Sequence, residues 1–249
     1  MKHYILILLV IVIIFIFLKK KEGFEKNDIT IVISRYNENL EWLNDEKYIR
    51  YPITIYNKGT NDDFYKPPNL KIVKLPNVGV CDHTYLYHII HNYDNLANVT
   101  IFLPGSCMDD HKKEKTDNVV KNTIKTNNTV IYGNYEENEI KNKIYDFELK
   151  EWSTTNNKNK ELNNNPKLRR CDIYPYGKWY EAVFPDININ HITYAGIFSA
   201  SKKHIHNRSK QSYETLINFV NKDKNEECAH YIERSWIAIF HPLPKECIF

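Results

Sequence analysis

The fold is decided by a β-branched stretch near the start of the chain, residues 29–34, which reads Ile29-Thr30-Ile31-Val32-Ile33-Ser34. Its apolar residues follow one another without polar alternation, and this pattern is typical of a strand buried on both faces, as in a parallel sheet. Similar runs follow at 51–56, 69–75 and 98–103, with helical spacing at 39–48 and 82–93. The sequence therefore predicts an α/β domain with an open, mostly parallel sheet flanked by helices.

The second half of the chain carries a weaker pattern. Residues 112–128 and 153–168 are rich in Lys, Asn and Thr with little periodicity, and we expect surface loops there. Short strands are predicted at 130–132 and 190–199, and an amphipathic helix at about 209–220. A last helix is predicted at 226–240, and it ends before His241-Pro242 because proline disfavours helix at the residue before it.

An apolar segment precedes the domain. Tyr4–Leu18 is uninterrupted by charge and lies between Lys2 and the triplet Lys19-Lys20-Lys21. As a helix it spans about 22 Å, less than the ~30 Å hydrocarbon core, and flanking lysines that snorkel make up part of the difference. The residues that follow offer no small-x-small cleavage site, which favours an uncleaved signal-anchor over a signal peptide. We expect a single-pass membrane anchor at 1–21, a short stalk at 22–28 and one domain at 29–249.

Composition excludes several classes of protein. The chain has 249 residues, of which 42% are hydrophobic and 13% aromatic, so it is not a disordered polymer. A net charge of only +3, without a basic stripe, argues against a nucleic-acid partner. The sequence contains no GxSxG, Walker A or GxGxxG motif, which weakens serine hydrolases, P-loop enzymes and standard dinucleotide-binding folds.

Five cysteines are spread along the chain without a CxxC pair, which excludes a zinc ribbon. We interpret them as ordinary buried thiols, and a single bridge such as Cys228 with Cys247 stays open.

Polar residues follow each predicted strand at its carboxyl end. In an open α/β sheet these ends share one edge, and ligands bind there where the strand order reverses. The candidates for substrate binding are Arg35, Tyr36, Asn37, Asn57, Lys58, Asn77, Gly79 and Gly105.

Among these candidates, Arg35 and Lys58 suit a diphosphate, Arg as a bidentate fork and Lys as a point charge. The alternative is that each pairs with a neighbouring carboxylate. After the fourth strand, Asp109, Asp110 and His111 offer oxygen and imidazole ligands for a divalent cation such as Mn²⁺ or Mg²⁺. The competing interpretation of this run is a solvated charged loop.

Three residues are candidates for catalysis, namely Asp82, His83 and Glu38. Asp82 and His83 stand at the start of a predicted helix, where backbone N–H groups favour an anion. Asp82 is either a base or a plain helix cap. In the last helix, Glu233-Arg234 is interpreted as a structural ion pair, with a reach toward the cleft as the alternative.

Several blocks of the sequence resemble the DUF3431 family, which is found in fungi, some bacteria and large DNA viruses. They include Arg35–Glu38, 55–59, 76–79, 83–86 and 102–105, with Ala195–Phe198 and Glu233–Trp236 near the C-terminus. The resemblance covers most of 29–240 and implies an uncharacterised protein. The Lys, Asn and Ile bias suits a giant-virus member, which places the anchor in a host endomembrane or a virion membrane.

One departure from this family matters. Its members usually carry Gly-Arg-Glu-Gly before the His-Thr-Tyr, whereas here Gly79 is followed by Val80-Cys81-Asp82. Val80 and Cys81 thus replace the family's Arg and Glu.

The arrangement also resembles glycosyltransferases of the GT-A type, in which the first strand opens a nucleotide pocket and a later acidic motif binds metal and diphosphate. Here Arg35–Glu38 takes the first place and Asp109–His111 the second, although a true DxD is absent. The resemblance implies a membrane-anchored glycosyltransferase-like enzyme with a nucleotide sugar and a glycan acceptor as partners. Two alternatives stay open: a non-catalytic binding or scaffold protein, and a metal-assisted hydrolase using His83 and His111.

Overall fold

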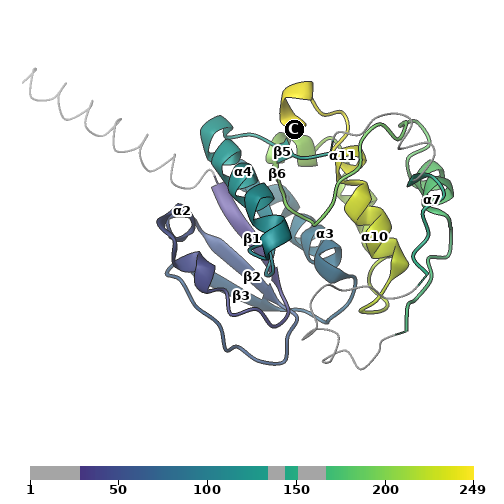
Figure 1. The fold of residues 1–249 in the computed structure, drawn as a ribbon. Helices are drawn as coiled ribbons and strands as arrows, with labels where there is room; N and C mark the ends of the chain where they lie inside the picture. The colour runs from purple at the N-terminus through teal and green to yellow at the C-terminus, as the bar shows by residue number, and fades with distance from the viewer. Residues whose placement is uncertain (1–28, 134–143, 151–166) are drawn as a thin grey trace, which may run out of the picture.

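A computed structural model describes residues 29–133, 144–150 and 167–249. Its centre is a six-stranded mixed sheet with the order β3-β2-β1-β4-β6-β5 (Figure 1). The strands are β1 (Ile29–Arg35), β2 (Ile53–Asn57), β3 (Leu70–Lys74), β4 (Val99–Pro104), β5 (Val130–Ile131) and β6 (Phe198–Ser201).

Four strands are parallel, as the sequence predicted, because the pairs β1–β2, β1–β4 and β2–β3 all run in one direction. The other two form the antiparallel part, in which β6 pairs with both β4 and β5. The α/β class is therefore confirmed, and the sheet is mixed rather than purely parallel.

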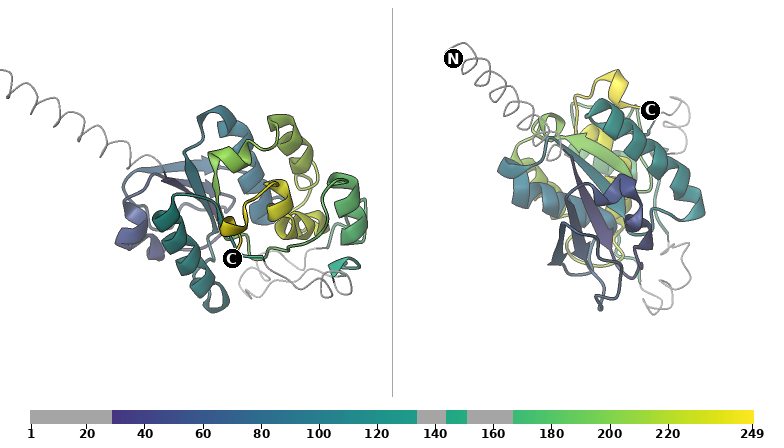
Figure 2. Two further views of the ribbon diagram at one scale, coloured as in Figure 1. Left: turned by 90° about the horizontal axis from the view of Figure 1, so that it is seen from above. Right: turned by 90° about the vertical axis from the view of Figure 1, so that its left-hand side faces the viewer.

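Helices cover both faces of the sheet, as the two views of Figure 2 show together with Figure 1. Alternate residues of β1 point to opposite faces. Val32 joins a core with α3 (Val80–Asn92), α7 (Tyr176–Val183), α9 (Lys210–Ile217), α10 (Glu227–Arg234) and α11 (Trp236–Ile239). Ile31 and Ile33 join a second core with η1 (Glu41–Asn44), α2 (Glu46–Ile49) and α4 (Asp110–Thr126).

Short elements complete the connections between these layers. They are η2 (Tyr93–Asn95), α8 (Lys202–Ile205) and η4 (Lys245–Cys247).

The prediction of a loop at 112–128 was wrong, because α4 occupies it. The helix buries Thr116, Val119, Val120 and Thr123 at helical spacing. Two of these four are threonines whose hydroxyls bond within the core, with Thr123 Oγ1 donating to Ser199 Oγ at 2.8 Å. A hydropathy pattern counts threonine as polar, and the apolar stripe was therefore missed.

Several other boundaries also differ from the predictions. The strand predicted at 190–199 begins only at Phe198, because Ala195 and Gly196 have φ of 69° and 58° and interrupt extended backbone. The helix predicted at 226–240 is divided at Ser235 into α10 and α11, and it ends before His241 as expected.

The predicted anchor (1–21) and stalk (22–28) lie outside the described residues, as does most of 153–168. Within the three described ranges, no helix has the length and apolar character needed to cross a membrane.

The prediction for the cysteines needs a correction, because Cys171 forms a disulfide with Cys228. Cys228 therefore does not pair with Cys247, which is a buried free thiol like Cys81 and Cys107. Because the two cysteines are 57 residues apart in the sequence, no local motif indicated that they pair. The bridge joins the segment before α7 to the first turn of α10, and a disulfide of this kind is typical of oxidising compartments.

Candidate functional site

The strand order reverses between β1 and β4, since the chain proceeds outward from β1 to β2 and β3 and then returns to the other side of β1. Ligands of open α/β sheets bind at the carboxyl ends of strands at such a point. Here Gly105 N donates to Ser34 O at 2.7 Å, and Thr84 of α3 bonds to the Ser34 hydroxyl at 2.9 Å. These contacts fix the start of α3 against the end of β1.

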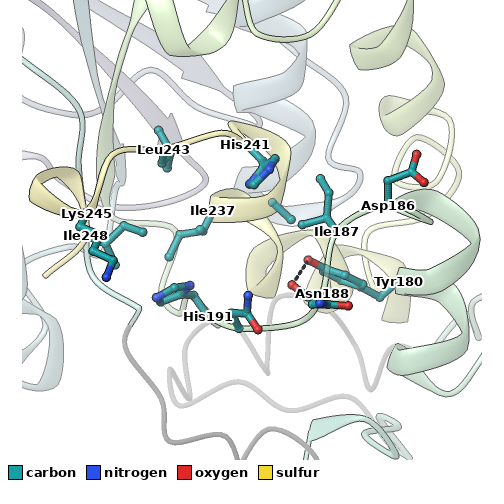
Figure 3. A pocket seen from close by; sticks show the side chains of 12 residues that line it. Tyr180, Asp186, Ile187, Asn188, His191, Ile237, His241, Leu243, Lys245 and Ile248 are labelled. Atoms are coloured by element: carbon teal, nitrogen blue, oxygen red, sulfur yellow. Dashed lines mark hydrogen bonds between the residues drawn. The ribbon is translucent and has the colours of Figure 1, made fainter.

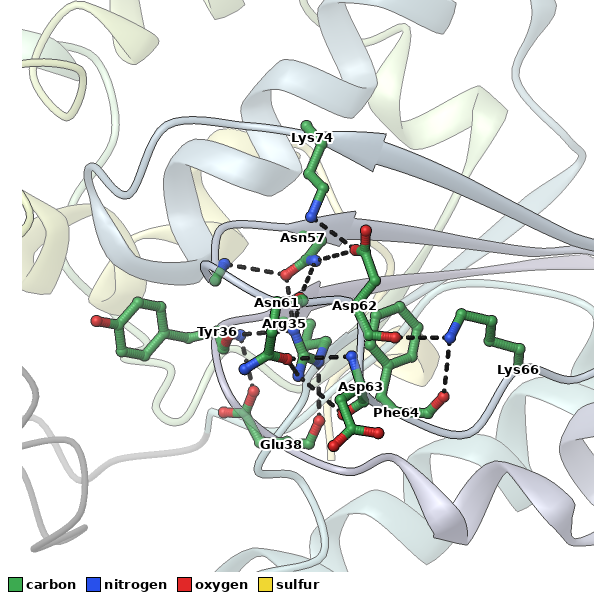
Figure 4. Close-up of polar contacts among 11 residues, drawn as sticks. Arg35, Tyr36, Glu38, Asn57, Asn61, Asp62, Asp63, Phe64, Lys66 and Lys74 are labelled. Carbon is green, nitrogen blue, oxygen red and sulfur yellow. Dashed lines mark hydrogen bonds and ion pairs between the residues drawn. The ribbon is translucent and has the colours of Figure 1, made fainter.

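Arg35 lies just beyond this point, buried with 1% of its surface exposed. Its guanidinium donates to Glu38 O, to Asn57 Oδ1 and to both oxygens of Asn61, and it lies 4.3 Å above the Phe64 ring (Figure 4). All three of its nitrogens thus bond to the protein. Burial lowers the pKa of Arg35 more than the nearby carboxylates raise it.

Arg35 therefore positions the loop after β2. We do not assign it the phosphate-binding role that its place in the sequence suggested.

Glu38 and Asn57 also organise the loops in which they lie. Glu38 Oε2 accepts from Tyr36 N at 2.7 Å and from Asn37 N at 3.1 Å. A Cβ on Gly105 would come within 2.6 Å of the same oxygen, which explains a glycine there. The Asn57 amide is fully buried: its oxygen accepts from Arg35 and its nitrogen donates to Asp62. Glu38 and Asn57 therefore hold the loops at the edge of the sheet in place and do not point outward from it.

Lys58 is buried beneath the loop that leads into α3. Its Nζ donates to Val78 O at 2.5 Å and to Val80 O. Burial lowers the pKa of Lys58 to about 7 against the opposing effect of Cys81 and Asp82.

The loop that Lys58 supports needs glycine at one position. Gly79 has φ of 55°, and a Cβ there would come within 2.0 Å of Val220 O. Asn77 is half-buried on the same loop.

Asp82 lies in the first turn of α3 and is 2% exposed. Its Oδ1 accepts from Trp236 Nε1 at 2.8 Å, while Cys81 Sγ lies 3.8 Å from Oδ2. Burial, and secondly the charge of Glu233, raise the pKa of Asp82 to about 8. Asp82 is therefore mostly protonated at neutral pH and is a buried acid rather than an ionised base.

Asp82 and Glu233 form a pair of carboxyl groups whose charges interact. The Glu233 side chain is 20% exposed. Its Oε1 accepts from Ala195 N at 2.8 Å, and its Oε2 lies 3.8 Å from His230 Nδ1 and 3.6 Å from Arg234 Nη1. Burial acts to raise the pKa of Glu233, but His230, Arg234 and the Ala195 N–H together lower it. Glu233 is thus ionised where Asp82 is protonated.

Two cations lie beside Glu233. Lys115 extends from α4 to donate to Tyr194 O at 2.7 Å, and burial lowers the pKa of Lys115 to about 8 despite the opposing charge of Glu233. The Arg234 guanidinium lies 3.8 Å from the Phe147 ring centroid and 4.9 Å from that of Tyr194. Its Nε is buried without a hydrogen-bond partner among the described residues.

His83 is 6% exposed, and its Nδ1 has no hydrogen-bond partner in the described part of the chain. Burial, with the charge of Lys58, lowers the pKa of His83 to about 3. The imidazole is therefore neutral at physiological pH.

The residues predicted to bind a metal lie at the start of α4. Asp109 precedes the first turn of α4 and lies 3.5 Å from Lys112 Nζ, while Asp110 and His111 are exposed on that turn. Across the described ranges, no group of three or more His, Cys, Asp or Glu side chains is arranged to hold a metal.

Comparison with known proteins agrees with the resemblance seen in the sequence. The family model described as "Protein of unknown function (DUF3431)" matches residues 31–248, nearly the whole chain. The protein belongs to the DUF3431 family. The search among curated proteins finds no match.

In this DUF3431 member, the structure shows where Val80 and Cys81 lie. Val80 is 37% exposed at the entrance to α3, whereas Cys81 is buried against Gly196. Asp82 and Glu233 are carboxyl groups close to this position whose charges interact.

Glu233 and Lys115 were not among the sequence candidates for this site. The sequence signals for Glu233 were its motif with Arg234, interpreted as a structural ion pair with a reach toward the cleft as the alternative, and its place in the block that resembles the DUF3431 family.

Proposed function

We propose that this DUF3431 protein is a glycosyltransferase-like enzyme that binds a nucleotide sugar at the carboxyl ends of β1 and β4. The observation that carries the proposal is the Asp82–Glu233 pair, in which one pKa is raised and the other lowered. Carboxyl groups with opposed pKa shifts at a ligand-binding edge are typical of acid–base catalysis. The chain's resemblance to GT-A enzymes supports the choice of substrate.

Glu233 is the group best suited to act as the base, because it is ionised and partly exposed. In the reaction that we propose, an acceptor hydroxyl oxygen attacks C1 of the sugar and its proton passes to Glu233. The bond between C1 and the diphosphate oxygen breaks, and the nucleoside diphosphate leaves. Asp82, which accepts a hydrogen bond from Trp236, keeps its proton within electrostatic range of Glu233. Glu233 is therefore the one ionised carboxylate of the two.

The cations beside Glu233 suit the departing diphosphate. Lys115 extends from α4 and donates to Tyr194 O. The buried Nε–H of Arg234 has no hydrogen-bond partner among the described residues. Charge-assisted bonds from such groups stabilise the negative charge that develops on the leaving group. These steps use only the chain's own residues, and the predicted Mn²⁺ or Mg²⁺ is tested in the assay below.

We further propose that the predicted N-terminal anchor holds this domain at a membrane, on a side where disulfides form. The Cys171–Cys228 bridge supports that placement, because such bonds persist in oxidising compartments.

The test is release of nucleoside diphosphate from a panel of UDP- and GDP-sugars by the full chain in mild detergent, with and without Mn²⁺ or Mg²⁺. Replacing the base by Glu233→Gln is expected to lower the rate by roughly 10²- to 10⁴-fold, the usual contribution of general acid–base catalysis. Glu46→Gln is the matched control, since Glu46 is exposed on α2 away from this edge and is expected to keep the wild-type rate.

The proposal fails if no nucleotide sugar shifts the melting temperature under any of these conditions. A shift in melting temperature without release of nucleoside diphosphate would instead indicate the binding or scaffold protein that the loss of the family's Arg and Glu suggests.

A further inference from the structure

A cavity lies away from the candidate site, between α7, α11 and the C-terminal segment (Figure 3). Its volume of about 580 Å³ falls within the range of small-molecule sites, ~300–1,000 Å³. The floor is apolar: Ile237 and Ala238 of α11 are buried there, and Ile187 and Ile248 are half-buried on its walls. A cavity of this volume with apolar residues on its floor can hold the hydrocarbon part of a small ligand.

The charges around this cavity are unevenly distributed. Lys245 and His191 lie at one end in Figure 3, and Asp186 lies at the opposite end. His241 contributes a further imidazole between them. One end therefore offers a cation and N–H donors, while the one carboxylate among the described lining residues is far from them.

This cavity is distinct from the Asp82–Glu233 pair, although the segment 190–195 contributes residues to both. Asn190 and His191 line the cavity, whereas Ala195, farther along the same segment, donates to Glu233. The cavity includes neither carboxylate of the pair, so its ligand need not be a substrate of the proposed transferase.

We propose that this cavity binds a small organic anion, a carboxylate or phosphate monoester on an apolar body. The anionic head lies at the end with Lys245 and His191, where charge-assisted hydrogen bonds form. The apolar body lies on Ile237 and Ala238, whose surface it removes from water. This inference does not depend on the proposed transferase activity.

The experiment measures the dissociation constants of four probes that share one ring, using the full chain in mild detergent at low ionic strength. Phenylacetate and phenyl phosphate are the two anionic heads, phenylacetamide is neutral and phenethylamine is cationic. We expect both anions, or one of them, to bind at least fivefold more tightly than the amide and the amine. The better anion identifies the preferred head group.

Lys245→Met is expected to weaken binding of the anion by about fivefold, the effect of one partly exposed charge pair. Lys210→Met on α9 is the matched control, because Lys210 is exposed and outside the cavity, and it is expected to change nothing. Ile248→Trp places a large ring in the cavity and is expected to weaken all probes together. Asp186→Asn is expected to leave anion binding unchanged or to strengthen it.

Equal binding of the anion and the amide, or tightest binding of the amine, would overturn the proposal. So would unchanged anion binding in Lys245→Met, or the absence of binding by either anion at 10 mM, on the order of the weak affinities of fragments this small. Because none of these readouts uses a nucleotide sugar, the result is independent of the transferase assay.

Discussion

Replacing Asp82 with asparagine is predicted to stabilise the protein at alkaline pH. Asp82 is almost fully buried, and burial together with Glu233 raises its pKa from 3.8 to about 8. A folded-state pKa above the unfolded one means that folding takes up a proton at this group. The stability that Asp82 contributes is therefore fully present below about pH 4 and is lost as the pH rises through 8.

The size of this loss follows from the shift. Each pKa unit corresponds to about 1.4 kcal/mol, so a shift of about four units costs up to about 6 kcal/mol above pH 8. The asparagine of the Asp82→Asn variant would have no proton to gain, and its amide oxygen can still accept from Trp236 Nε1 as Asp82 does at 2.8 Å. Because Glu233 shares in the titration, we expect an advantage of about 2–6 kcal/mol for the variant at pH 9 and little difference near pH 4.

The assay is urea unfolding of the full chain in mild detergent, followed by tryptophan fluorescence at one-unit steps from pH 4 to 9. Asp94→Asn is the control, because it makes the same change of side chain at an exposed position. If Asp82→Asn lowers the free energy of unfolding equally at every pH, then Asp82 is an ordinary hydrogen-bonding residue and the assignment of a protonated acid is refuted.

Three further variants test residues that support the fold around the site, each by urea unfolding. Gly79→Ala places a Cβ within 2.0 Å of Val220 O at positive φ. We expect it to lower the free energy of unfolding by at least about 2 kcal/mol. A smaller loss would show that the loop can shift to accommodate the Cβ. Arg35→Met removes the buried hydrogen-bond donors that hold the loop after β2. We expect it to lower the free energy of unfolding by about 3–5 kcal/mol. An unchanged free energy would mean that water replaces the donors of Arg35. Converting Cys171 and Cys228 to serine should cost about 4 kcal/mol, and the same stability in wild type with and without reductant would contradict the bridge.

The parallel half of the sheet could be predicted from the sequence because its signal is local. Residues 29–34 and 98–103 are runs dominated by β-branched and other apolar residues, and the structure has β1 and β4 there within a residue or two. The start of α3 was likewise marked by its loop and apolar spacing.

The antiparallel half and α4 could not be predicted from local signals. The side chains of α4 that face the sheet include Thr116 and Thr123, which become core residues only because their hydroxyls find partners at Cys107 O and Ser199 Oγ. Those partners are brought close by the fold, and Ser199 is 76 residues from Thr123 in sequence. A window of sequence contains no information about such a pairing.

The sequence predicted a ligand site at the carboxyl ends of the strands, and the structure shows which of the predicted residues lie together there. Arg35 and Glu38, which follow β1, bond to their own loops, whereas the pair that carries the proposal joins Asp82 to Glu233 from α10. The bond that brings α10 and α11 to this edge, Trp236 Nε1 to Asp82, spans 154 residues. Proximity over such a separation is a property of tertiary packing, and one sequence alone does not reveal it.

The electrostatics of this edge argue for function because they oppose stability. Lys58 and Asp82 are both buried where their charged forms are disfavoured, with pKa values of about 7 and about 8. An apolar side chain in place of a buried ionisable group is often neutral or stabilising, so a domain needing only its fold would gain by losing them. Groups that titrate near neutral pH and cost stability are instead typical of sites that move protons. The catalytic role that we propose for Asp82 and Glu233 would account for this cost in stability.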